Sequence, residues 1–284
     1  MPKAQQLTEP DAVHAEGPVW SPGWGGLRWV DMHAGDVLHL DQTTGRVHRW
    51  HIGTVAAAIR PRLTGGAVIA TERDFVLADH LDGPTRPAAE GITAAGVRFN
   101  DGACDPQGNF YCGTMAYDET PGAGALFRLS ATTLQVQRVL GNLTISNGLA
   151  WTADGSRTYY VDTPTGRVDV FDYDTDGFTN RRPFVTIDPN DGFPDGLTID
   201  SDDGVWVALW NGHAVHHYDN TGILAEVIDV PPSQVTACTF GGPHLNDLFI
   251  TTSATGNVAP DHGAGAVFHC RTDVTGLPAQ PFHG

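Results

Sequence analysis

A polar side chain followed at once by glycine recurs at four places along the chain. The pairs are Glu16-Gly17, Asp101-Gly102 (with Asn100 directly before it), Asn147-Gly148 and Asp195-Gly196. Asp101 and Asn147 are 46 residues apart, and Asp195 follows Asn147 by 48. Glu16 precedes Asp101 by 85 residues, close to two such intervals. The common spacing indicates equivalent positions in a repeating unit.

These side chains all offer oxygen atoms, and two or three of them are carboxylates. Carboxylates that face one another away from water are unfavourable unless a proton or a cation neutralises them. Oxygen ligands suit hard divalent ions, so we favour Ca²⁺, with Zn²⁺, Mn²⁺, Mg²⁺ or Fe²⁺ as alternatives. Taken singly, Asn-Gly and Asp-Gly are common turn dipeptides. It is the shared phase of the four that favours a metal site over four turns.

The elements that position these residues also repeat. Six short apolar runs rich in β-favouring residues recur about every 40–50 residues, at 27–30, 67–70, 110–112, 158–161, 205–207 and 248–250. Turns rich in Gly, Asp and Pro precede most of the runs, and a second strand with alternating apolar residues follows each run. This pattern is typical of antiparallel meanders, and no long segment shows a helical period.

We therefore predict an all-β fold, a six-bladed β-propeller of four-stranded antiparallel blades, with residues 1–284 forming a single domain. Ring closure protects the sheet edges, and we expect the segment 7–13 to complete the last blade. Because the innermost strands line the central channel, the four polar positions should converge there. A β-sandwich or two small β domains is the alternative, but no linker divides the chain near its middle.

Composition restricts the partners and the surroundings. The chain has 16 Lys and Arg against 33 Asp and Glu, a formal net charge of −17, so we expect no nucleic-acid binding. No apolar segment approaches the roughly 18 residues of a membrane span, and we expect a cytoplasmic protein without membrane contact. The four cysteines are interpreted as buried reduced thiols, although Cys104 and Cys112 could face each other across a hairpin. Most of the 13 histidines are interpreted as surface or channel-lining residues.

Several motifs around the polar positions resemble those of one known family. They are the segments at 15–20, 98–102, 113–115, 145–151, 171–174, 193–196, 206–208 and 238–242. In this order they are similar to the SMP-30/gluconolactonase/regucalcin family, over nearly the whole chain. The resemblance implies a six-bladed propeller, in agreement with the repeat.

The resemblance also implies roles for individual residues. It implies a divalent metal ion held by Glu16, Asn147 and Asp195. It further implies substrate contacts from Arg98 and Asn100, with Asp101 close by. Family members carry a substrate-contacting glutamate shortly after Gly-Thr-Met. Asp118 is the positional match, in a loop at 116–124 that is either a lid or an ordinary surface loop.

From these residues we predict a metal-dependent lactonase, which opens a sugar lactone (an aldonolactone) to the sugar acid. The ion would polarise the carbonyl, and Asp195 is the candidate general base. The partner would be a small sugar lactone, and the protein a monomer or a weak homo-oligomer. The rival hypotheses are a calcium-dependent phosphotriesterase or arylesterase on the same fold, a non-catalytic calcium-binding regulatory protein, and a propeller that serves only as an interaction platform.

Overall fold

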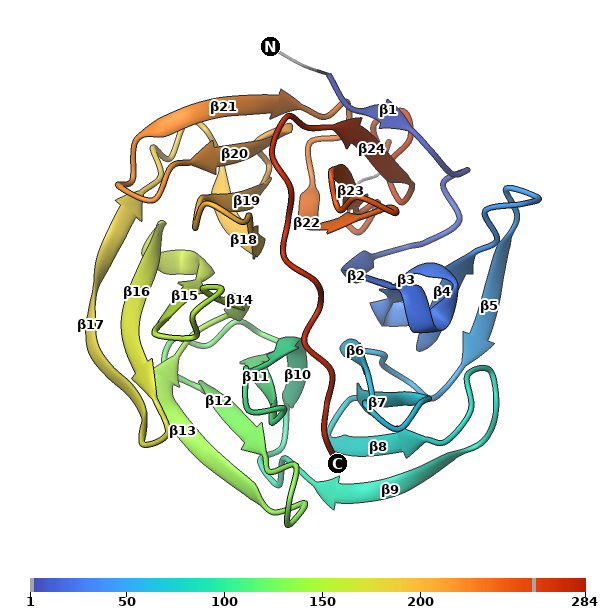
Figure 1. Cartoon of the computed structure of the whole chain (residues 1–284), viewed down its shortest axis with the longest axis vertical. Coiled ribbons are helices and arrows are strands. Elements are labelled where there is room, and N and C mark those ends of the chain that lie inside the picture. The colour runs from blue at the N-terminus through green and yellow to red at the C-terminus, as the bar shows by residue number, and fades with distance from the viewer. Residues whose placement is uncertain (1–2, 257–258) are drawn as a thin grey trace.

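The computed structural model describes residues 3–256 and 259–284. Six four-stranded antiparallel sheets are arranged around a central axis, which confirms the predicted six-bladed propeller (Figure 1). Blade 1 contains β2 (Ala15–Ser21), β3 (Gly26–Asp31), β4 (Asp36–Leu40) and β5 (Val47–His51). Blade 2 contains β6 (Ala58–Pro61), β7 (Ala67–Ala70), β8 (Asp74–Ala78) and β9 (Thr85–Glu90). Blade 3 contains β10 (Val97–Cys104), β11 (Phe110–Ala116), β12 (Gly124–Leu129) and β13 (Val136–Leu143).

The second half of the chain continues the same pattern. Blade 4 contains β14 (Ser146–Trp151), β15 (Arg157–Asp162), β16 (Arg167–Asp174) and β17 (Gly177–Thr186). Blade 5 contains β18 (Phe193–Ile199), β19 (Val205–Trp210), β20 (Ala214–Tyr218) and β21 (Leu224–Asp229). Blade 6 contains β22 (Val235–Gly241), β23 (Asp247–Thr252), β24 (Val267–Arg271) and β1 (Gln5–Gln6). Three short 3₁₀ helices lie between strands, η1 (Pro22–Trp24), η2 (Met32–Ala34) and η3 (Thr163–Thr165).

The N-terminus completes the last blade, as predicted, but with a different segment. Gln5 pairs with His269 and Gln6 with Phe268, so β1 is the outer strand beside β24. The predicted segment 7–13 is instead the connection that leads from β1 to the inner strand β2. It contains Pro10, which has no N–H to donate to a ladder. Pairing the two ends of the chain in one blade closes the ring and leaves no gap between the first and last blades.

The polar–glycine pairs lie inside the innermost strands rather than in turns. In β10, β14 and β18 two residues oppose one residue of the neighbouring strand, at Asn100-Asp101, Asn147-Gly148 and Asp195-Gly196. Similar register shifts occur in β2 and β22. Such β-bulges re-aim side chains and are common beside active sites. The six apolar runs of the sequence are the second strands of the blades.

The glycines of two of these pairs, Gly148 and Gly196, allow neighbouring blades to approach closely near the axis. A Cβ atom on Gly148 would lie only 2.7 Å from the carbonyl oxygen of Asp195 and from the amide nitrogen of Leu197. Gly196 is similarly tight against Ala237 of the next blade. The glycines are therefore needed because inner strands of adjacent blades touch through their backbones.

The C-terminal segment, residues 272–284, crosses one face of the ring beyond β24 (Figure 1). Its backbone bonds to blades on opposite sides, with Leu277 N donating to Ile199 O and Phe282 N donating to Pro61 O at 2.7 Å. The Phe282 side chain is fully buried. This segment covers one end of the central channel, so the other end is the open one.

All four cysteines are buried free thiols, as expected. In the register of β10 and β11, Cys104 opposes Phe110 and Cys112 opposes Gly102, so the two thiols are not cross-strand partners. Within the described residues, no helix has the length and apolar character that a membrane span needs.

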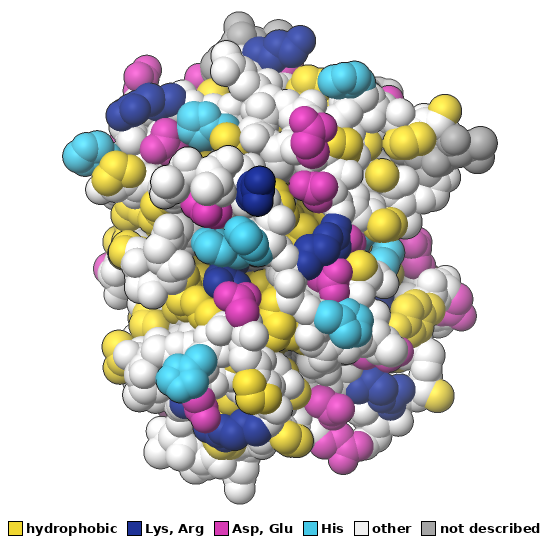
Figure 2. Space-filling model, turned by 90° about the vertical axis from the view of Figure 1, so that its right-hand side faces the viewer, with side chains coloured by type: hydrophobic (Ala, Val, Ile, Leu, Met, Phe, Trp, Pro, Cys, Tyr) yellow, Lys and Arg dark blue, Asp and Glu magenta, His cyan; other side chains and the backbone are white. Residues whose placement is uncertain are grey.

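The side of the ring carries interspersed charges. Figure 2 shows Lys and Arg side chains standing singly among Asp, Glu and His on the face turned to the viewer. Several surface cations pair with acids, such as Arg49 with Asp36 at 2.8 Å and Arg86 with Asp79 at 3.5 Å. Exposed pairs of this kind contribute little to stability.

Candidate active site

The open end of the channel holds a cavity of about 440 Å³. Five of the residues singled out from the sequence line it, namely Glu16, Arg98, Asn100, Asn147 and Asp195. They come from the inner strands of blades 1, 3, 4 and 5. The predicted convergence of residues far apart in the chain is therefore present in the structure.

Three carboxyl groups are buried close to one another beneath this cavity. The residues Glu16 and Asp195 are only 3% and 5% exposed. Burial, reinforced by the charge of Asp101, raises the pKa of Glu16 to about 8. Burial, followed by the charges of Glu16 and Asp101, raises the pKa of Asp195 well above its usual range. Burial also raises the pKa of Asp101. A nearby cation would relieve this electrostatic cost.

Two ligand-type oxygens at the site lack a partner. Asn147 Oδ1 and Asp195 Oδ1 are buried, and neither has a hydrogen-bond donor among the described residues. Asn147 Nδ2 donates to Thr163 Oγ1 at 3.1 Å, which holds the amide in place. Buried acceptors without donors are rare in proteins, and an oxygen-binding cation would satisfy both. The donor set therefore fits a hard divalent ion.

The proposed ligand set combines two carboxylates and one amide. Across residues 3–256 and 259–284, no cluster of three or more His, Cys, Asp or Glu side chains is arranged to hold an ion. The amide of Asn147 would thus have to complete the set with Glu16 and Asp195. Glu16 Oε2 accepts the Gly17 amide hydrogen at 3.0 Å, while Oε1 lies 3.9 Å from His14 Nε2.

Arg98 and Asn100 form a connected polar wall of the cavity. Arg98 Nη1 donates to Asn100 Oδ1 at 2.8 Å and to Phe99 O at 2.9 Å. Asn100 Nδ2 in turn donates to Ser146 O in the next blade at 3.1 Å. The hydrogen bonds found for Arg98 within the described chain all use Nη1, so its Nη2 and Nε hydrogens have no acceptor among the described residues.

Asn100 and Asp101 take different places. Asn100 is the first unpaired residue of the bulge in β10, as Asn147 and Asp195 are in theirs, so Asn100 is the equivalent of those two. Asp101 is the second unpaired residue and lines a separate cavity of about 110 Å³ between the carboxyl groups and the C-terminal segment. Arg60 lines the same small cavity. The structure thus puts Asp101 behind the predicted substrate-binding space.

Asp118 lies apart from the cavity. Its side chain is exposed, and its Oδ1 accepts hydrogen bonds from the Thr120 amide at 3.1 Å and the Thr120 hydroxyl at 2.7 Å. These bonds lower the pKa of Asp118. The next residue, Glu119, has a positive φ of 56° and lines the cavity instead. Asp118 therefore shapes the loop, and the acid of this loop that lines the cavity is Glu119.

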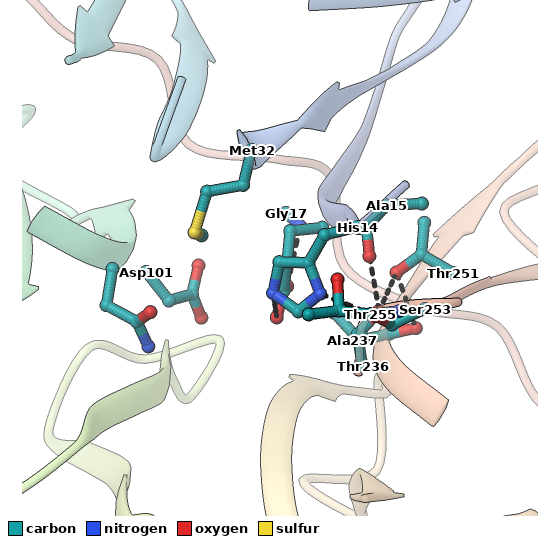
Figure 3. A network of polar contacts seen from close by, with 12 residues as sticks. His14, Ala15, Gly17, Met32, Asp101, Thr236, Ala237, Thr251, Ser253 and Thr255 are labelled. Atoms are coloured by element: carbon teal, nitrogen blue, oxygen red, sulfur yellow. Dashed lines mark hydrogen bonds and ion pairs between the residues drawn. The ribbon is translucent and has the colours of Figure 1, made fainter. Parts of the chain in front are cut away.

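Two histidines at the cavity had no assigned role in the sequence. The rings of His14 and His33 stack with centroids 4.6 Å apart. His14 Nδ1 lies 2.8 Å from Ser253 Oγ (Figure 3), and burial lowers the pKa of His14 well below its usual range. His14 could have been found from strand alternation, since it stands two residues before Glu16.

In blade 6 the residue at the register shift of the inner strand has a structural role. Thr236 lies at the register shift in β22, and its Oγ1 donates to Ala15 O at 2.6 Å and contacts Thr251 Oγ1 at 2.8 Å (Figure 3). A threonine that ties blade 6 to blade 1 contributes no carboxylate to the ring. This agrees with the sequence, where the polar–glycine pair occurs in only four blades.

Comparison with known proteins identifies the family of this chain. The family model described as SMP-30/Gluconolactonase/LRE-like region matches residues 14–254. The chain belongs to this family. Among curated proteins it is 36% identical to pentonolactonase XacC of Haloferax volcanii, over 93% of this chain and 92% of that protein. It is 34% identical to regucalcin of Danio rerio, over 92% and 90% of the two chains.

Solved structures of the family share the fold. A structure described as a calcium-binding protein, regucalcin, from Agrobacterium tumefaciens aligns with a TM-score of 0.93 at 23% identity, covering 100% of this chain and 99% of that one. At this identity the likeness supports the propeller alone. Membership of the SMP-30/gluconolactonase family, which includes lactonases, supports a hydrolase of sugar lactones.

Proposed function

We propose that this protein is a metal-dependent hydrolase that opens an aldonolactone to the sugar acid. The observation that carries the proposal is the pair of buried oxygens of Asn147 and Asp195 that have no hydrogen-bond partner among the described residues, on side chains that line an open cavity together with the buried Glu16. The 36% identical relative named as a pentonolactonase supports the same chemistry. The substrate would enter from the mouth opposite the C-terminal segment.

Glu16, Asn147 and Asp195 would hold the ion, with Ca²⁺ favoured by the all-oxygen donor set. When bound, such an ion polarises a carbonyl and stabilises the oxyanion that develops on it. The chain itself supplies the fixed geometry. Thr163 holds the Asn147 amide, and the Gly17 amide holds one oxygen of Glu16.

Asp195 is the proposed general base. In hydrolysis a water oxygen bonds to the lactone carbonyl carbon, a water proton moves to the Asp195 carboxylate, and the bond from that carbon to the ring oxygen then breaks. The ring oxygen takes up the proton from Asp195, which becomes a carboxylate again, and the ring oxygen becomes the hydroxyl of the sugar acid. Asp195 lines the cavity that would receive the substrate, as a general base for this reaction must.

Arg98 and Asn100 would orient the substrate. The Arg98 guanidinium presents its N–H groups as a planar fork that suits the hydroxyl and ring oxygens of a sugar. Its bond to Asn100 and the Asn100 bond to Ser146 fix both groups before substrate arrives. A wall held in place in this way lowers the entropic cost of positioning a polyol.

The experiment combines chelation with matched variants. Protein treated with chelator, and then with single divalent ions, is assayed on a panel of aldonolactones. Asp195→Asn and Glu16→Gln should each reduce kcat by about 100-fold or more, with an unchanged circular dichroism spectrum. Asp118→Asn is the matched control, because this acid is exposed and bonded within its own loop. Full activity after chelation, or near-normal rates in both site variants, would overturn the proposal.

A calcium-binding protein without catalysis is the second candidate, favoured by the 34% identical relative named regucalcin. It predicts calcium binding that depends on Glu16 and Asp195, without turnover of any lactone. A fluorophosphate and an aryl ester belong in the same panel. Faster hydrolysis of either than of every lactone would favour the phosphotriesterase or arylesterase hypothesis.

A further inference from the structure

The cavity is built in two tiers. In blades 3, 4 and 5 the residue two positions before each bulge residue also lines the cavity, giving Arg98 above Asn100, Ile145 above Asn147 and Phe193 above Asp195. In blade 1 His14 stands two residues before Glu16 and lines it too. Arg98 and Phe193 lie in the same strands as Asn100 and Asp195, where alternate residues share a face and each residue rises about 3.3 Å. These two upper-tier residues therefore lie roughly 7 Å from the lower tier along the strands.

The upper tier is chemically divided. Blades 1 and 3 contribute the polar side chains of His14 and Arg98, whereas blades 4 and 5 contribute Ile145 and Phe193. Phe193 opposes Trp210 in the register of β18 and β19, and Trp210 lines the cavity as well. Arg98 and His14 thus make one side of the mouth polar. The other side carries apolar surface over two neighbouring blades, and Thr163 and Asn211 are the polar members of its lining.

The apolar side is not explained by folding. Phe193 lines the cavity and is 42% exposed, so its ring is free to be covered by a ligand. Burying an apolar group of a ligand against Phe193 would be favourable, because it removes apolar surface from water. A hydroxyl placed against Ile145 or Phe193 would lose its bonds to water and find no donor or acceptor on these two side chains. The apolar side therefore selects against a hydroxyl.

We infer that this apolar side binds the exocyclic group of the lactone, and that the preferred substrate carries a hydrogen or a methyl group there instead of a hydroxymethyl group. The inference rests on the proposed lactonase function and adds the substrate class. The ring hydroxyls would face Arg98 on the polar side. The lower tier would hold the lactone carbonyl, one tier away from the exocyclic carbon.

The test uses two series of 1,5-lactones whose members differ only at the exocyclic group. One series is glucono-, 6-deoxyglucono- and xylonolactone, and the other is D-galactono-, D-fucono- and L-arabinonolactone. After subtraction of spontaneous hydrolysis, we expect kcat/KM to be at least tenfold higher for the methyl or hydrogen member than for the hydroxymethyl member of the preferred series. The ratio reports selectivity, so a merely structural defect would not change it.

Substitutions at Phe193 and Ile145 test whether these two side chains cause the preference between exocyclic groups. Phe193→Ser and Ile145→Thr each add a hydroxyl to the apolar side and should bring the ratio towards one. Leu224→Ser is the matched control, since Leu224 is an exposed apolar residue on β21, the outer strand of the blade that carries Phe193. Its ratio should equal that of the unaltered protein.

Equal rates within both series, or a preference for the hydroxymethyl members, would overturn the inference while leaving the lactonase proposal intact. A preference that survives both Phe193→Ser and Ile145→Thr would also overturn it. Failure to hydrolyse any of the six lactones, with each candidate ion supplied, would instead overturn the proposed function and the inference with it.

Discussion

Replacing Glu16 with glutamine should stabilise the protein when no ion is bound. Glu16 is buried beside two other carboxyl groups, and burial with the Asp101 charge raises its pKa from an ordinary value of 4.5 to about 8. Glutamine has nearly the same shape and cannot ionise. The variant therefore removes the electrostatic cost while preserving most of the packing.

The sign and the size of this change in unfolding free energy follow from the linkage between proton binding and folding. A carboxyl group with a raised pKa in the folded state binds its proton more tightly there than in the unfolded chain. Stability is then highest below pH 4.5 and is lost as pH rises to about 8. The pKa change of about 3.5 units, at about 1.4 kcal/mol per unit, is worth up to about 5 kcal/mol. That is a large part of a typical unfolding free energy of about 5–15 kcal/mol.

The measurement is urea denaturation in excess chelator at pH 5 and pH 8.5. At pH 5 the parent protein and Glu16→Gln should have similar unfolding free energies, since Glu16 is then protonated in the folded state. At pH 8.5 the variant should be the more stable, by up to about 5 kcal/mol. Glu90→Gln, an exposed acid on β9, is the control and should follow the parent at both values.

Adding Ca²⁺ should reduce or reverse the difference in stability between Glu16→Gln and the parent protein at pH 8.5. An ion that binds only the folded state raises the unfolding free energy by mass action, and Glu16→Gln lacks one of the proposed ligands. At pH 8.5 with saturating ion, the parent should gain stability and the variant should gain much less. If the parent and Glu16→Gln keep the same difference at pH 5 and pH 8.5 without ion, the buried-carboxylate argument is wrong.

Two further substitutions test the frame around the site. Phe282→Ala should lower the unfolding free energy by about 3–5 kcal/mol, because the ring is fully buried. Urea denaturation measures this loss, with the exposed Leu63→Ala as the control. A loss below about 1 kcal/mol, or one no larger than that of Leu63→Ala, would contradict the role of the C-terminal segment. Gly148→Ala should weaken binding of a divalent ion in calorimetric titration, because its Cβ would lie 2.7 Å from Asp195 O and push β14 from β18. Gly53→Ala, which meets no atom within 4 Å, is its control, and equal affinities in the two variants would refute the argument.

The sequence predicted the repeat, and with it the fold. Apolar runs at a period of about 40–50 residues are a local property of the chain, and only a ring of sheets buries six such units without a free edge. The phase of Glu16, Asn147 and Asp195 in that repeat was equally visible. Their convergence then follows from symmetry, since equivalent positions on inner strands lie at one depth around the axis.

The sequence did not distinguish neighbouring residues at the site. Asn100 and Asp101 were both candidates for the ring position, and Asp118 was chosen over Glu119. The structure places Asn100 and Glu119 at the main cavity and turns Asp101 towards the smaller one. A one-residue difference reverses the direction of a side chain, and it depends on bulge register and turn geometry that a single sequence does not reveal.

The chain by itself thus determined the residue types and their periodic spacing, because both can be found along one dimension. Only the tertiary structure decided which side chains share the cavity and which end of the channel is covered. The C-terminal segment illustrates the reason. Phe282 has no periodic signal, and its burial depends on backbone bonds to strands more than 200 residues earlier, such as the bond from its amide to Pro61 O. Contacts across such separations are selected by packing of the whole ring, which no local pattern encodes.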